Sequence, residues 1–188
     1  MNPHQQLVIF SLFLFVFLTV PVSAADIASG EQKAGACVSC HGQQGNSSNA
    51  QWPNLAAQQA VYLANQLKAF KAGERINPMM QSMAANLDNN DITNLAAFFS
   101  SRKAVTAGGD PALAKSGADK AGMCLGCHGA NAQGNGQFPR LAGQHPEYLA
   151  LQLNAFKQGL RKSGPMQAIA ANLSEADIKA LTAYFGSL

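Results

Sequence analysis

Apolar side chains recur every three or four residues along most of this chain, the spacing of one face of an α-helix. Residues 58–72 and 146–158 show this pattern with tyrosine, leucine and phenylalanine. Residues 29–40 and 113–127 are expected to form a further helix each. The glycine-rich stretches that follow, 42–48 and 129–136, lack the alternation of apolar and polar residues typical of a strand. The pattern therefore predicts an all-α protein.

A last helix is expected to begin after Asp88 and another after Ser174. Both residues are good N-caps, and each is followed three residues later by an aspartate, the arrangement of a capping box. An apolar stripe then follows in each segment and is expected to form the core against the first helix: Ile92, Leu95, Phe98 and Phe99, and Ile178, Leu181, Tyr184 and Phe185. Gly30 and Gly117, at matching positions of that first helix, would allow the helix pair to cross closely, and an ordinary loop glycine is the alternative at each position.

The same succession of elements occurs twice because the sequence itself repeats. Residues 52–101 align with residues 138–187 without a gap, and about half of the positions are identical. The chain is therefore a tandem duplication of one domain. We predict domains at 25–103 and 112–188, joined by a small, flexible linker at 104–111.

The first 24 residues are predicted to be a signal peptide. An unbroken apolar run at 7–20 ends at Pro21 and is followed by Val22, Ser23 and Ala24, the small-residue pattern that signal peptidase prefers. The run is shorter than the roughly 20 residues that span a bilayer. Cleavage near Ala24 would deliver the protein to the periplasm. A retained membrane anchor is the alternative, because no lysine or arginine precedes the run.

All four cysteines belong to two C-x-x-C-H motifs, Cys37–Cys40–His41 and Cys124–Cys127–His128. This motif is the attachment signature of c-type haem: two thiols on one helical turn reach two vinyl groups of the porphyrin, and the histidine binds the iron. The alternative is a thiol redox or zinc site. The adjacent histidine occurs twice, and no further Cys or His pairs exist to complete tetrahedral sites. Two covalently bound haems c are therefore expected, with His41 and His128 as iron ligands.

The register between the copies selects a sixth ligand for each iron. A methionine thioether is a common sixth ligand of such haem. The second copy has one methionine after its motif, Met166, and this residue aligns with Met80. Met79 and Met83 are interpreted as packing residues, with Met83 as the runner-up because it shares a helical face with Met80. His145 is interpreted as a solvated residue at a helix start.

The charge pattern argues against nucleic acid as a partner and against strong electrostatic docking of a redox protein. The formal net charge is +3, spread thinly and without a basic stripe. The propionates of two haems would bring the holoprotein close to neutral. Docking with protein partners is therefore expected to be weak and transient. No small-molecule substrate is expected, and peripheral association with a membrane stays open.

An attachment motif near the start of each repeat, with a methionine far downstream, resembles class I cytochromes c, and two such domains in tandem resemble the cytochrome c4 family. The resemblance covers residues 25–188 and includes the segment 138–144. It implies two cytochrome c domains packed about a pseudo-twofold axis. It also implies that the carbonyls of Pro53 and Pro139 orient His41 and His128, and that Leu55 and Leu141 line the haem faces. Candidate partners of the propionates are Arg75, Arg161, Lys71, Lys157, Tyr62 and Tyr148.

Iron with both axial positions taken by protein suits an electron carrier and not an enzyme. By resemblance, electrons would pass from a bc1-type, quinol-oxidising complex to a terminal oxidase or reductase. One alternative is a cytochrome subunit that accepts electrons from a dehydrogenase or flavoprotein. A di-haem peroxidase is a third hypothesis, against which Met80 and Met166 argue.

Overall fold

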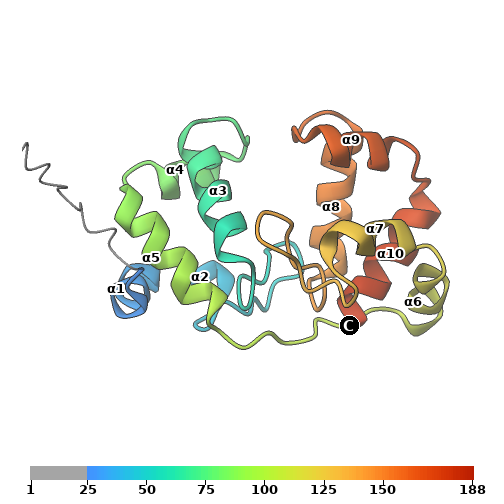
Figure 1. Ribbon diagram of the computed structural model, residues 1–188, viewed down its shortest axis with the longest axis horizontal. Coiled ribbons are helices and arrows are strands. Elements are labelled where there is room, and N and C mark those ends of the chain that lie inside the picture. The colour runs from blue at the N-terminus through green and yellow to red at the C-terminus, as the bar shows by residue number, and fades with distance from the viewer. Residues whose placement is uncertain (1–24) are drawn as a thin grey trace, which may run out of the picture.

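The computed structural model describes residues 25–188; the predicted signal peptide, residues 1–24, lies outside the described residues. Figure 1 shows two halves side by side, each built from helices and loops. The first half contains α1 (Ile27–Lys33), the 3-10 helix η1 (Ala34–Ala36), α2 (Val38–His41), α3 (Ala60–Lys71), α4 (Pro78–Ala84) and α5 (Asn89–Ser100). The second half contains α6 (Pro111–Ala118), α7 (Gly122–His128), α8 (Pro146–Lys157), α9 (Gly164–Ala171) and α10 (Glu175–Ser187). The predicted all-α fold with a repeated unit is confirmed.

The last helix of each half begins where the capping residues predicted. The Asp91 N–H donates to the Asp88 carboxylate at 2.7 Å, and the Asp177 N–H donates to the Ser174 hydroxyl at 3.1 Å. Both capping boxes are complete. The apolar stripes of α5 and α10 supply the largest fully buried side chains, which are Phe98, Ile92, Leu95, Ile178 and Leu181. These two helices are therefore the centres of the two cores.

The first element of each half is not the single helix that the sequence predicted. In the first half α1 gives way to the 3-10 turn η1 before the attachment motif. In the second half a turn at residues 119–121 separates α6 from α7. A continuous helix would hold the thiols on a face set by its 3.6-residue period. The break allows the attachment turn to take a direction independent of the helix that packs on α5 or α10.

Gly30 and Gly117 lie where α1 crosses α5 and α6 crosses α10, as predicted. A Cβ added to Gly30 would lie 2.1 Å from the carbonyl oxygen of Asn94, and one added to Gly117 would lie 2.1 Å from that of Ala180. Backbone atoms on the facing helix cannot yield easily to such a contact. The absence of a side chain at these two positions is what allows each helix pair to pack closely.

Replacing Gly30 by alanine is expected to destabilise the protein by about 1–3 kcal/mol or more, since an extra methyl group would overpack a closed crossing. The measurement is the free energy of unfolding of the holoprotein in denaturant. Gly35→Ala is the matched control, because nothing lies within 4 Å of a Cβ at that position. Equal stability of the two variants would contradict the proposed role of the crossing.

The stretch between the halves is bonded to the second half, although the sequence predicted a flexible linker there. The Gly108 N–H donates to the Gly186 carbonyl at 2.9 Å, and the Thr106 hydroxyl donates to the Leu188 carbonyl at 3.2 Å. Figure 1 shows this stretch running along the lower edge of the molecule to α6, close to the C-terminus.

Among residues 25–188, no helix is both long enough and apolar enough to cross a membrane.

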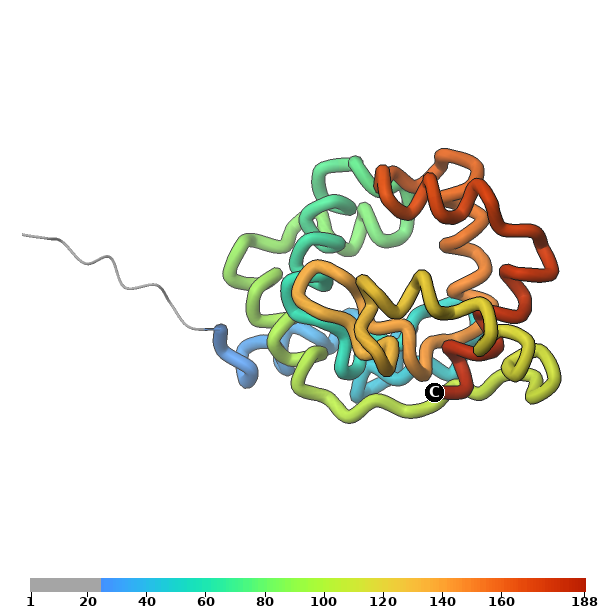
Figure 2. Tube along the Cα trace, turned by 45° about the vertical axis from the view of Figure 1, so that its right-hand side comes forward, coloured from blue at the N-terminus to red at the C-terminus, as the bar shows by residue number. Residues whose placement is uncertain are grey.

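The loops that follow the attachment motifs, 42–59 and 129–145, meet between the two halves (Figure 2). Their contacts are hydrogen bonds between residues far apart in the sequence, such as the one from the Asn54 side chain to the Gly143 carbonyl at 3.0 Å. The loops therefore join the halves at the end of the molecule where the motifs lie.

Candidate functional site

Each C-x-x-C-H motif forms one helical turn. In the first half the His41 N–H donates to the Cys37 carbonyl at 3.0 Å, and α2 ends at His41, directly before Gly42. The second motif lies wholly within α7, which ends before Gly129. Both glycines have positive φ, 78° and 85°, so the chain turns away directly after each histidine. The two cysteines of a motif are three residues apart, close to the 3.6 residues of one helical turn, so their thiols lie on a common side.

The thiols do not have the character of a redox-active pair. All four cysteines are free, and burial raises the pKa of the Cys37 and Cys124 thiols. A thiol redox motif instead depends on a lowered cysteine pKa. In the part of the chain that the structure describes, no three His, Cys, Asp or Glu side chains gather where they could hold a metal ion, as a zinc site would need.

Both motif histidines are buried and held by a proline carbonyl. His41 and His128 are 8% and 6% exposed. Their Nδ1 atoms donate to the carbonyls of Pro53 and Pro139 at 2.9 and 2.7 Å, the contacts that the resemblance implied. A carbonyl can only accept, so Nδ1 carries the proton and Nε2 keeps a free lone pair. Burial lowers the pKa of both rings, although the bond to proline opposes this effect. A neutral imidazole with Nε2 available is the form that binds a metal.

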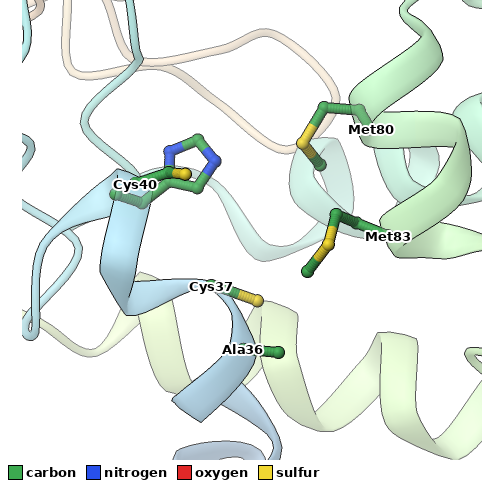
Figure 3. A pocket seen from close by; sticks show the side chains of 6 residues that line it. Ala36, Cys37, Cys40, Met80 and Met83 are labelled. Atoms are coloured by element: carbon green, nitrogen blue, oxygen red, sulfur yellow. The ribbon is translucent and has the colours of Figure 1, made fainter.

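A cavity that is partly open to solvent lies beside the first motif. Its lining side chains come from the attachment turn and from α4: Ala36, Cys37, Cys40, His41, Met80 and Met83. Figure 3 shows both methionine side chains pointing from α4 toward the turn that carries the cysteines. Apart from the His41 ring, no lining side chain carries nitrogen or oxygen. Two thiols, an imidazole and facing thioethers in an apolar cavity fit a covalently attached haem.

Local sequence explains why the methionines lie on short helices. The Asn77 side chain caps α4 by accepting from the Met80 N–H at 3.0 Å, and Pro78 occupies its first turn. Met79 is 58% exposed and does not line the cavity. In the second half Met166 lies at the equivalent place, in the first turn of α9. The sequence predicted the register of these residues and a shared helical face for Met80 and Met83, but not the bounds of the two short helices.

Two arginines join the halves at α3 and α8. The Arg75 guanidinium donates to the Tyr148 hydroxyl at 3.0 Å, and that of Arg161 donates to the Tyr62 hydroxyl at 2.8 Å. Each arginine also donates to the side chains of Gln66 and Gln152. The two arginines and two tyrosines, predicted as candidate propionate partners, therefore form a symmetrical network across the interface.

The two candidate lysines are engaged differently. Lys71 donates to the Leu87 carbonyl and Lys157 to the Leu173 carbonyl. Each ammonium therefore binds the backbone at the end of the loop that carries the methionine helix, within its own half. This gives both lysines a structural role that the sequence did not reveal.

The interface also contains residues to which sequence reasoning gave no role. Gln58 and Gln144 occupy matching positions and are buried, at 6% and 5% exposure. Each one hydrogen-bonds the backbone of the other half. His145, interpreted as solvated, is half-buried, and its Nε2 lies 2.9 Å from the Ser47 carbonyl of the first half. That interpretation was wrong because a helix start that faces solvent in an isolated domain is covered when two domains pack.

Comparison with known proteins agrees with this geometry. The family described as Cytochrome c matches the chain twice, at residues 27–103 and 114–188. Cytochrome c4 of Pseudomonas aeruginosa is 38% identical, with 95% of this chain and 96% of that protein covered. The crystal structure of reduced recombinant cytochrome c4 from Pseudomonas stutzeri superimposes with a TM-score of 0.83 at 38% identity, covering 88% of this chain and 100% of that chain.

A further relative carries a different name. A protein of Stutzerimonas stutzeri strain A1501 called thiosulfate dehydrogenase electron acceptor is 36% identical, with 81% of this chain and 79% of that protein covered. Its name indicates that a protein with a similar sequence receives electrons from an enzyme.

Proposed function

We propose a function that starts from one fact: this chain belongs to the cytochrome c4 family of di-haem electron-transfer proteins. In this proposal the chain carries electrons from a quinol-oxidising, bc1-type complex to a terminal oxidase or reductase. Membership of the family establishes that the chain transfers electrons and is not an enzyme. It also establishes that the chain attaches one haem c through Cys37 and Cys40 and one through Cys124 and Cys127. The partners, the iron ligands and the compartment belong to the proposal.

The observation that carries the proposal is the matched donor set in the two halves. A neutral histidine, fixed by a proline carbonyl, would bind each iron from one side. Met80 and Met166, on α4 and α9, would bind from the other. Bound haem iron supplies a one-electron couple, and a histidine with a methionine thioether raises its reduction potential. An iron held by both side chains would have no free position for a substrate.

The periplasm is the proposed compartment. Residues 1–24 form the predicted signal peptide, with cleavage near Ala24, and covalent haem attachment accounts for every cysteine of the chain. Partners would dock transiently near the two sites, since the net charge is small. Peripheral association with the membrane surface is compatible with partners that lie in it.

The holoprotein is expected to titrate in two one-electron steps, and its oxidised spectrum should show the thioether band of His/Met haem for both sites. Redox titration followed by absorbance makes the measurement. The reduced protein should not bind carbon monoxide, because methionine would occupy the position that this ligand needs. Carbon monoxide binding to either haem of the intact protein would contradict the closed donor sets.

A second candidate function is a cytochrome subunit that takes electrons from a dehydrogenase or flavoprotein. The relative named as a thiosulfate dehydrogenase electron acceptor favours it. Copurification of the native protein in a stable complex of fixed stoichiometry with such an enzyme would support this function over the free carrier. Recovery as a free protein that is reduced by a bc1-type complex would support the first.

A further inference from the structure

Gln58 and Gln144 each cross the interface and pair with one residue of the other half. The Gln144 Oε1 accepts from the Asn54 N–H at 2.8 Å, and its Nε2 donates to the Asn54 carbonyl at 2.9 Å. The Gln58 side chain makes the same two bonds with Arg140, at 2.7 and 3.0 Å. We call these two side chains the crossed glutamines. Each one is a buried amide that holds one residue of the opposite half by both backbone groups.

The residue held in this way directly follows the proline that orients a histidine. The Asn54 N–H and the Pro53 carbonyl belong to the same peptide group. That carbonyl accepts from His41 Nδ1 at 2.9 Å, while the N–H donates to Gln144 at 2.8 Å. One peptide group therefore connects a side chain of the second half to the candidate iron ligand of the first. In the reverse direction, the peptide between Pro139 and Arg140 connects Gln58 to His128 in the same manner.

Hydrogen bonds linked through one peptide group strengthen one another. An acceptor at the N–H shifts electron density toward the carbonyl oxygen, which then accepts more strongly from the histidine. A stronger bond at Nδ1 makes the imidazole a more basic ligand. A more basic ligand favours the oxidised iron and lowers the reduction potential. The effect is not diluted by solvent, since Asn54 is 7% exposed and His41 is 8% exposed.

We propose that each crossed glutamine is a positioning residue for the proximal histidine of the opposite half and lowers the reduction potential of the haem in that half. The two sites would then be coupled through the interface, and the potential of each haem would depend on the packing of both domains. The inference rests on the proposed assignment of His41 and His128 as iron ligands.

The test uses Gln144→Leu in the full-length holoprotein, a change that keeps the approximate side-chain volume and removes both bonds to Asn54. Redox titration followed by NMR assigns a potential to each haem. The reduction equilibrium of the first haem should shift in favour of the reduced state by about twofold to tenfold, the value of one net hydrogen bond. A tenfold shift corresponds to about 59 mV for one electron. The Nδ1 proton of His41 in the reduced protein should move upfield, as expected for a weaker hydrogen bond.

Two further variants distinguish this effect from simple loosening of the interface. Gln58→Leu should shift the second haem and leave the first. Gln59→Leu is the matched control: Gln59 also crosses the interface, to the Gln133 carbonyl at 2.9 Å and the Gly136 N–H at 3.3 Å, but touches neither proline peptide. It should leave both potentials unchanged. The Gln144 variant is the cleaner of the pair, since Asn54 is uncharged and its counterpart Arg140 is charged.

The crossed pattern decides the outcome. Equal shifts of both haems in all three variants would show loosening of the interface and overturn the proposal. Unchanged potentials with intact His/Met spectra would also overturn it and leave the proposed function standing. Spectra without a histidine ligand in the unmodified protein would overturn the ligand assignment instead, and the coupling with it.

Discussion

Replacing Met166 by alanine will lower the reduction potential of the second haem by about tenths of a volt, within the roughly 0.8 V over which axial ligands set haem potentials. A thioether favours the reduced iron, so its loss favours the oxidised state. The first haem should keep its potential and its thioether band. Redox titration of the purified variant, read by absorbance, gives both quantities.

The case for Met166 rests on its place in the chain and in the fold. It is the single methionine that follows the second attachment motif. It lies in the first turn of α9, at the position of the repeat that aligns with Met80 in α4. Met123→Ala is the control within the same half, because this methionine precedes the motif and is 68% exposed. An unaltered second-haem spectrum in Met166→Ala would show that another residue completes this site.

Within each half, the sequence was informative wherever a feature is local. Capping boxes at Asp88 and Ser174 located the last helices, because the signal lies within four residues. Gly30 and Gly117 indicated the helix crossings because a repeat makes matched glycines visible. The helix predicted at 29–40 was wrong, since the break at η1 follows from packing on α5 and from the direction of the attachment turn, neither of which has a local signal.

Between the halves, the sequence was much less informative. The crossed glutamines and His145 bond residues 82 to 98 positions away, and no periodicity marks such contacts. Arg75 and Arg161 were selected as propionate partners from their charge and matching register. Their bonds to tyrosines of the opposite half, 73 and 99 positions away, appear only when two domains pack. The duplication supplied a weak clue. When the same residue stands at matching positions of both copies and is not part of the core of either domain, it is a candidate for a symmetrical interface.

The choice between Met80 and Met83 is the point at which fold and sequence must be combined. Both side chains line the cavity of the first half and point toward the attachment turn (Figure 3). They lie three residues apart on α4, so one helical face presents both. The repeat favours Met80, because it aligns with Met166, whereas Met83 aligns with Ile169, which has no donor atom. A duplicated domain that kept its ligand position would therefore use Met80.

Met80→Ala is accordingly expected to lower the potential of the first haem by about tenths of a volt, as Met166→Ala does for the second, and to remove its thioether band. Met83→Ala should retain the band and shift the potential little, since it removes a packing group that is 41% exposed. The double variant controls for substitution of one thioether by the other: a band that survives in Met80→Ala but not in the double variant would show that Met83 can replace Met80. If Met83→Ala alone abolishes the band, the two halves bind iron with different turns of their methionine helices, and the repeat does not preserve the ligand register.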